Sequence, residues 1–147
     1  MVLTWDGKVS IIDDETIQYY LDHEQDIDAG DKSFTVRMGE LSSDLNILMT
    51  SMKISSACVI TAWNPRSFPT EFGINVAQQR HLHDDLNAKG FKHFPAVGRD
   101  RENTWHEEGF LVLGCDIASI IELCNKYDQN AVVWIDRESP AKIVLMR

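Results

Sequence analysis

The sequence predicts an α+β fold, and two observations lead to this prediction. Apolar runs of strand length alternate with segments whose apolar residues recur at helical spacing. From Ser56 onward the order is strand, helix, strand, strand, helix, strand, with one extra strand at the end. This order is typical of the split βαβ arrangement of ferredoxin-like domains. We therefore expect a ferredoxin-like core from Ser56 to Asp136; a different mixed sheet built from the same elements is the alternative.

The N-terminal part is expected to add to this core. The chain has 147 residues, of which 44% are hydrophobic, so we expect a single domain over residues 1–147. Residues 1–32 form an acidic, partly helical arm, either docked or partly mobile, and residues 33–147 form the main part. Asp13 or Asp14 caps a helix in the arm whose apolar positions are Ile17, Tyr20 and Leu21, with Ile27 as a further candidate. Residues 29–31 end this helix.

The elements before the first long helix follow from apolar spacing. Residues 34–37 alternate as in a short strand. Leu41, Leu45, Leu48 and Met52 recur at helical spacing, which predicts a helix over residues 40–52 with one apolar stripe. Residues 56–63 are nearly all apolar, which is typical of a central strand covered on both faces.

The remaining elements complete the predicted sheet. Residues 70–88 are expected to form a helix that Gly90 closes. Residues 91–98 are expected to form a strand at a sheet edge, because Pro95 cannot donate to a neighbouring strand. Residues 105–114 form the next strand, and Asp116 caps a helix after it. Residues 131–136 and 141–146 form a terminal hairpin.

Charge and cysteine content exclude some classes of partner. The chain carries 23 acidic and 14 basic side chains, and its net charge of -9 opposes binding to nucleic acid or to an anionic membrane. No apolar run reaches the ~20 residues of a membrane span, and the N-terminus lacks the pattern of a signal peptide. The three cysteines have no paired spacing. We therefore expect a reduced, cytoplasmic protein without a membrane segment.

A polar motif follows the predicted central strand. Residues 61–67, Thr-Ala-Trp-Asn-Pro-Arg-Ser, come directly after the apolar run 57–60. In the split βαβ order, the ends of the neighbouring strands meet this point of the sheet, so unusual polar residues converge at one edge. The converging residues are Asn64, Arg66, Ser67, Arg99, Glu107, Glu108, Gln129 and Asn130. Asn75 and Gln79 lie at the same end of the following helix, with Arg80 beside them.

This edge is predicted to bind a small polar or anionic molecule. Arg66, Arg80 and the N-terminus of the helix that begins near Thr70 would hold an anionic group. The motif residues Trp63 and Ser67 would line the site. Further polar groups of the ligand would be recognised by Asn64, Asn75, Gln79 and Gln129.

Catalysis has weaker candidates. Glu108 is preferred to Glu107 as a general base, because Phe110 and Val112 alternate with it and would place it at a core boundary, but the opposite facing stays open. No base accompanies a serine or cysteine nucleophile, so whether the protein is an enzyme, and with which cofactor, is left open. The five histidines have no metal-ligand spacing, and no metal site is predicted.

Each of these features also has a structural alternative. The Asn64-Pro65 pair can form a plain turn, and Trp63 and Trp105 can be core aromatics. The helix amides can bond to loop backbone, and the arginines can pair with Glu107 or Glu108. An alternative function is a protein-interaction module whose acidic arm contacts a basic partner.

The ordered motifs resemble a bacterial family of unknown function. The resemblance rests on the motif at residues 61–67, followed by Asn75 and the spaced leucines 82 and 86. It continues in Trp105-His106-Glu107-Glu108 before an apolar strand and in Gln129-Asn130-Ala131. It covers residues 34 to the C-terminus. The resemblance implies a small bacterial cytoplasmic domain and carries no activity.

Overall fold

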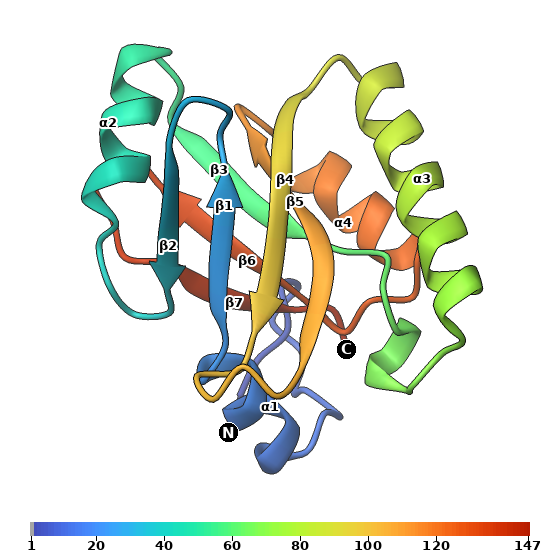
Figure 1. Cartoon of the computed structure of the whole chain (residues 1–147). Coiled ribbons are helices and arrows are strands. Elements are labelled where there is room, and N and C mark those ends of the chain that lie inside the picture. The colour runs from blue at the N-terminus through green and yellow to red at the C-terminus, as the bar shows by residue number, and fades with distance from the viewer. Residues whose placement is uncertain (1) are drawn as a thin grey trace.

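The computed structural model describes residues 2–147 and confirms the α+β class (Figure 1). Seven strands form one curled sheet in the order β2-β1-β4-β5-β3-β6-β7. Every neighbouring pair in this sheet is antiparallel. The strands are β1 (Glu24–Asp28), β2 (Ser33–Arg37), β3 (Ser56–Ile60), β4 (Lys92–Arg99), β5 (His106–Leu113), β6 (Ala131–Asp136) and β7 (Lys142–Leu145).

Four α-helices and one short 3-10 helix complete the described chain. Three of the α-helices begin after a side-chain cap, at Asp13, Ser42 and Asp116, whose oxygens accept a backbone N–H in the first turn. The helices are α1 (Asp14–Leu21), α2 (Ser43–Ser51), α3 (Phe72–Ala88) and α4 (Ile117–Lys126), and the 3-10 helix η1 spans Pro65–Ser67.

The curl of the sheet brings its two ends together at one point. The chain after β2 forms a β-bridge between Met38 and Ala141, which precedes β7. The amide of Gly39 donates to the carbonyl of Ala141 at 2.8 Å. The sheet is therefore a half-barrel with an inner face, with α2 lying toward one end of it and α1 near the other (Figure 1).

Apolar side chains pack on both faces of the sheet. On the outer face, Leu82 and Leu86 of α3 pack with Ile120 and Cys124 of α4 over Cys58, Ile60, Val112 and Val132. On the inner face, Leu45 and Met49 of α2 pack with Ala57, Val59 and Leu111. Strand β3 is therefore buried on both faces, as its apolar run predicts.

Two local predictions were wrong. Ile27 lies in β1 and not in a helix, because α1 ends at Leu21 and residues 24–28 pair with both β2 and β4. The strand with Pro95 is internal and not an edge strand. Pro95 is tolerated there because β1 pairs with β4 only from Ala96 onward. No strand on the β1 side therefore needs a backbone N–H from the proline.

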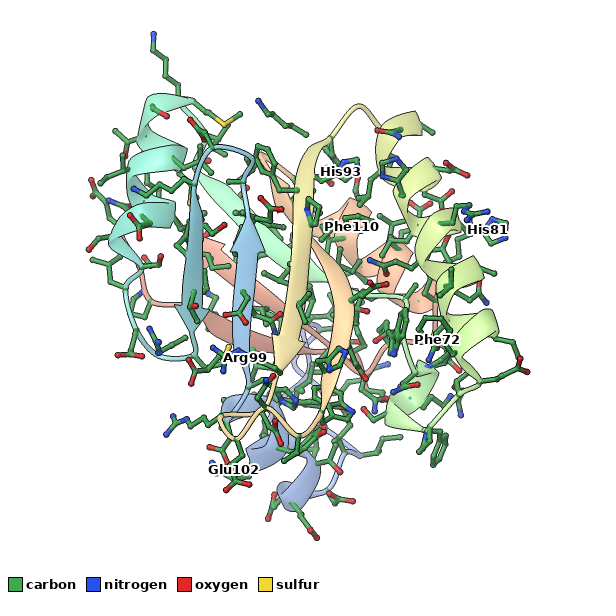
Figure 2. All side chains as sticks on the ribbon, viewed as in Figure 1. Phe72, His81, His93, Arg99, Glu102 and Phe110 are labelled. Carbon is green, nitrogen blue, oxygen red and sulfur yellow. The ribbon has the colours of Figure 1, made fainter. Side chains whose placement is uncertain are left out.

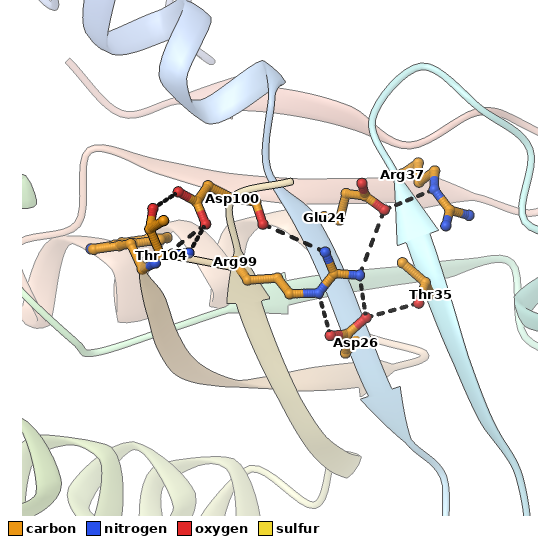
Figure 3. A network of polar contacts seen from close by, with 8 residues as sticks. Glu24, Asp26, Thr35, Arg37, Arg99, Asp100 and Thr104 are labelled. Atoms are coloured by element: carbon orange, nitrogen blue, oxygen red, sulfur yellow. Dashed lines mark hydrogen bonds and ion pairs between the residues drawn. The ribbon is translucent and has the colours of Figure 1, made fainter. Parts of the chain in front are cut away.

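Arg99 belongs to an ion-pair network at the start of β1 and not to the motif (Figures 2 and 3). Its Nε and one terminal nitrogen donate to the two carboxylate oxygens of Asp26, at 2.6 and 3.1 Å. The Arg99 guanidinium lowers the pKa of Asp26. Glu24 completes the network with Arg37, at 2.8 Å. Two acidic residues of the predicted arm, Glu24 and Asp26, thus form ion pairs with arginines of the sheet.

Gly109 marks a close approach of two strands and gives a stability prediction. A Cβ at this position would lie 2.7 Å from the carbonyl oxygen of Ile60, a backbone atom that cannot move aside. We expect Gly109→Ala to lower the free energy of unfolding by about 2 kcal/mol, as overpacking does. Chemical denaturation measures this loss.

Gly98 supplies the matched control. It lies in the neighbouring strand, but a Cβ there would meet only the end of the flexible Gln25 side chain, at 2.9 Å. Gly98→Ala should therefore change stability by less than about 1 kcal/mol. Equal losses for the two variants would contradict a specific contact at Gly109.

Candidate functional site

A cavity of about 490 Å³ opens between α1 and the inner face of the sheet, beside the end of β3. Its apolar floor includes Val59 of β3 and Val133 of β6. The rest of its wall comes mainly from α1, from the loop after β3, from the start of β5 and from the loop before β6. The polar and aromatic residues that matter most are Tyr19, Tyr20, His23, Trp105, Glu107 and Gln129.

Asn64 connects the motif to the cavity wall. Its side-chain oxygen accepts the backbone N–H of Thr70 at 3.0 Å and the amide of Asn75 at 2.8 Å. Its side-chain nitrogen donates to Oε1 of Glu107 at 3.1 Å. Asn75 also accepts the backbone N–H of Asn64 at 2.9 Å. Asn64 therefore fixes the loop, the start of α3 and one cavity carboxyl relative to one another.

The backbone of the motif is held in an unusual conformation. Asn64, Arg66 and Ser67 have φ values of 45°, 56° and 64°, which L-residues rarely adopt. The N–H of Arg66 donates to the carbonyl of Asp128 at 2.8 Å. The hydroxyls of Ser67 and Tyr20 lie 2.5 Å apart. Strained backbone of this kind persists where surrounding contacts hold it, and it is concentrated at functional sites.

Glu107 is a carboxyl without a cation beside it. Burial raises its pKa to about 8, and the hydrogen bond from Asn64 works in the opposite direction. No lysine or arginine lines the cavity among residues 2–147. Glu107 is therefore mostly protonated at neutral pH, which allows its carboxyl group to donate a hydrogen bond.

His23 is the second unusual polar group of the cavity wall. Only 7% of its surface is exposed, and its Nε2 atom has no hydrogen-bond partner. Burial lowers the pKa of the imidazole, so His23 is neutral at physiological pH. Its ring packs edge-on against Tyr19 and Trp105, with centroids 4.3 and 4.4 Å away. An unpaired buried nitrogen is costly, and a ligand in the cavity would satisfy it.

The structure brings part of the predicted site together. Together with Glu107, four residues that were predicted to converge near the motif lie in the cavity wall. They are Asn64, Ser67, Gln129 and Asn130. Gln129 is buried, and its amide nitrogen donates to the carbonyl of Trp63 at 3.1 Å. Asn130 donates to the Tyr20 hydroxyl at 2.9 Å. The loop before β6 is thereby tied both to the motif and to α1.

Other predicted residues support the cavity from outside it. Trp63 is buried against Phe72, with ring centroids 5.7 Å apart. Gln79 accepts the backbone N–H of Ala62 at 3.5 Å, and Asn75 bonds to the motif as described. The helix amides thus hold loop backbone, which is the structural alternative that the sequence left open. The buried stripe Asn75, Gln79, Leu82, Leu86 on α3 is the face that their spacing predicts.

The two arginines do not meet in the cavity. Arg66 is exposed and donates to a carboxylate oxygen of Asp128 at 2.6 Å, so its partner is neither Glu107 nor Glu108. Arg80 is exposed on α3. Neither side chain is part of the cavity wall.

The facing of the two glutamates is the reverse of the preferred prediction. Glu108 is exposed, whereas Glu107 lines the cavity. Successive strand residues point to opposite sides, and Gly109 follows as a buried position with no side chain. The apolar residues 110 and 112 therefore did not reveal which glutamate is enclosed.

Four ring residues of the wall escaped the sequence reasoning. Tyr19, Tyr20 and His23 belong to the segment that was predicted as an acidic arm, and Trp105 was considered as a core aromatic. One signal was present: three rings within five residues, at the end of the acidic helix α1 and directly after it. Such a cluster needs an apolar surface to cover, and the open end of the half-barrel provides it.

The histidines outside the cavity form a separate group. His93 of β4 and Phe110 of β5 lie beside His83 of α3, and the two imidazoles are 2.8 Å apart between Nε2 and Nδ1 (Figure 2). His81 points away from the sheet (Figure 2). In the described part of the chain, no three His, Cys, Asp or Glu side chains come together as metal ligands would. No helix within residues 2–147 has the length and apolar character needed to cross a membrane.

Comparison with known proteins identifies a family and no function. Neither the curated proteins nor the solved structures contain a match to this chain. The matched segment, residues 60–132, begins at the end of β3 and ends inside β6. It therefore contains the motif, α3, Glu107 and Gln129, but not the rings contributed by α1. Residues 60–132 match the model of the family described as "Protein of unknown function (DUF3293)".

Proposed function

We propose that the protein binds a small polar molecule in the cavity beside the 61–67 motif. The observation that carries this proposal is His23, which lies in the wall of the same cavity as Glu107 and whose buried Nε2 atom has no partner. A buried imidazole and a half-buried carboxyl around one cavity are the arrangement expected of a ligand site. A cavity of about 490 Å³ falls within the usual range for small-molecule sites.

The backbone around the cavity supports the same proposal. Three residues with positive φ follow β3 within one short segment, and contacts from Asp128 and Tyr20 hold them there. Folding alone does not require such a segment, because a plain turn would also connect β3 to α3. The strain is consistent with a loop that presents groups to a ligand.

Charge makes an anionic ligand the less favourable form of this proposal. Arg66 pairs with Asp128, Arg80 is exposed, and the titratable groups of the wall are Glu15, Tyr19, Tyr20, His23 and Glu107. An anion would enter this cavity without a positive partner, and burial of an unpaired charge is costly. We therefore revise the predicted ligand from polar or anionic to polar.

A thermal-shift screen of uncharged, cationic and anionic small molecules tests the proposal. A bound ligand raises the melting temperature of the native protein. His23→Phe keeps a ring against Tyr19 and Trp105 but removes Nε2, so this variant should fold and lose the shift. Arg66→Ala, whose side chain lies outside the cavity, should retain the shift. Equal loss in both variants, or a shift that survives His23→Phe, would contradict a site at this cavity.

The ferredoxin-like assignment of the core is also a proposal. It is supported by the consecutive order β4-β5-β3-β6 in the sheet and by the antiparallel direction of each pair. It is supported further by the packing of α3 and α4 in one core cluster on the same face. In this interpretation β1, β2 and β7 extend a split βαβ unit.

A further inference from the structure

We propose that the ligand is an uncharged, planar molecule that accepts a hydrogen bond from Glu107 and donates one to Nε2 of His23. This inference rests on the proposed function, since it assigns a chemical class to the ligand of the same cavity. It follows from the hydrogen bonds that are already made around these two side chains, from the charges near them and from the shape of the aromatic wall.

Glu107 supplies the donor. Its Oε1 atom accepts the side-chain amide of Asn64 at 3.1 Å. Without a cation nearby, a buried carboxyl favours its protonated form. The proton then resides on the other oxygen, and the group donates to an acceptor in the cavity. A carbonyl oxygen or an unprotonated ring nitrogen would fit this position.

His23 supplies the acceptor. Burial lowers the pKa of His23, and hydrogen bonding to the backbone of Tyr19 and Tyr20 acts in the opposite direction. Because Nε2 has no partner, we place the ring proton on Nδ1. The neutral imidazole therefore presents the lone pair of Nε2. A ligand N–H or O–H would complete it.

The charged groups near Glu107 and His23 are acidic, and no lysine or arginine among residues 2–147 lines the cavity. Asp22 and Asp100 act on His23 from outside, and both raise its pKa. Glu15, Tyr19 and Tyr20 are the other titratable groups of the wall. The pKa of Tyr19 is raised to about 12 by burial and by Glu107, so this phenol is neutral. An uncharged ligand thus avoids the cost of ionising Glu107 or of burying an unpaired anion.

The wall is suited to a flat ring. Tyr19 and Trp105 pack against each other with centroids 5.4 Å apart, and His23 packs against both. Gly98 of β4, which pairs with Glu107, and Gly109 of β5, which pairs with Ala96, add backbone without side chains to the lining. Aromatic and backbone surfaces of this kind accommodate a planar molecule of mixed polar and apolar character.

Three probes of one shape and different charge test the proposal. Benzamide is uncharged, benzamidine is a cation and benzoate is an anion near neutral pH. Calorimetric titration of the full chain at pH 6.5 should show benzamide binding at least tenfold more tightly than either charged probe. In Glu107→Gln, which keeps an acceptor for Asn64 and a donor for the ligand, the benzamide affinity should stay within threefold. Glu107→Ala should weaken it at least tenfold.

The pH dependence adds a readout specific to the carboxyl proton. Between pH 6.5 and 9, ionisation of Glu107 with a pKa of about 8 should weaken benzamide binding to the native protein by about tenfold. Glu107→Gln should not show this decline. A flat profile in the native protein, or loss of binding in a folded Glu107→Gln variant, would overturn the donor role.

The outcomes separate this inference from the proposed function. Preference for benzamidine that Glu107→Gln abolishes would overturn the uncharged class, because Glu107 would then act as a counter-ion. Preference for benzoate would overturn it as well. Either result leaves the cavity as a ligand site. Failure of all three probes to bind the native protein would count against the inference and the proposed function together.

Discussion

Glu107→Gln is expected to remove most of a decline in stability that the native protein shows between pH 5 and pH 8. The pKa of Glu107 is raised by burial from its ordinary value near 4.5 to about 8. Between these values the folded chain holds a proton that the unfolded chain releases. The contribution of Glu107 to stability is therefore greatest below pH 4.5 and is lost as the pH rises to about 8.

The expected size is roughly 3 kcal/mol over that interval. Urea denaturation at several pH values measures it as the difference in the free energy of unfolding between the native protein and Glu107→Gln. Taking the difference cancels other titrating groups, such as His23, whose lowered pKa gives the opposite trend. The difference should move in favour of Glu107→Gln as the pH rises.

Glu108→Gln is the matched control for this experiment. It removes the same charge from the adjacent residue, which is exposed. Its stability should follow that of the native protein within about 0.5 kcal/mol at every pH, as expected for a surface substitution. Parallel pH profiles for the native protein and Glu107→Gln would show that Glu107 is solvated in solution, contrary to its placement in the cavity wall.

Asn64→Ala is expected to cost about 3 kcal/mol of stability, the second large effect. Its side chain makes hydrogen bonds to the backbone of Thr70, to Asn75 and to Glu107. Their loss leaves partly buried partners unsatisfied. Alanine also tolerates the φ of 45° less well than asparagine does. Chemical denaturation near neutral pH measures the loss.

Asn103→Ala separates the two causes of this loss. Asn103 has a similar φ of 57° in the exposed turn between β4 and β5, and its side chain makes no hydrogen bond within the described chain. Its substitution should cost only the conformational part, about 1 kcal/mol. If the two substitutions cost the same, the hydrogen bonds of Asn64 contribute nothing net, and the motif is a turn and not an anchor of the cavity.

Sequence reasoning was most successful where apolar pattern alone decides the structure. The apolar run of β3, the Asp116 cap of α4 and the stripe from Asn75 to Leu86 are local signals, and the structure has each of them. The errors at Ile27 and Pro95 have one cause. Ile27 lies in the pairing of β1 with β4 and Pro95 lies directly beside it, and that pairing joins segments about 70 residues apart, which no local pattern reports.

In the candidate site, too, the sequence indicated the local features and missed those that depend on long-range contacts. The motif pointed to Asn64, Ser67 and Gln129, because strand ends that meet at one edge follow from topology. Closure of the cavity by α1 depends on long-range contacts such as the one between Tyr20 and Ser67. The arginines were predicted to bind an anion, but Arg66 forms an ion pair with Asp128. The position of Asp128 depends on the loop before β6, which the sequence pattern does not report.

The indole N–H signals of the four tryptophans, followed by NMR during a benzamide titration, test the central claim most directly. Trp105 lines the cavity, whereas Trp5 is about half exposed near the N-terminus and the indole of Trp134 donates to Asp136 at the far end of β6. The proposal predicts that Trp105 shifts and saturates while Trp5 and Trp134 stay in place. Unchanged Trp105, or equal shifts at all four, would contradict a ligand site between α1 and the sheet.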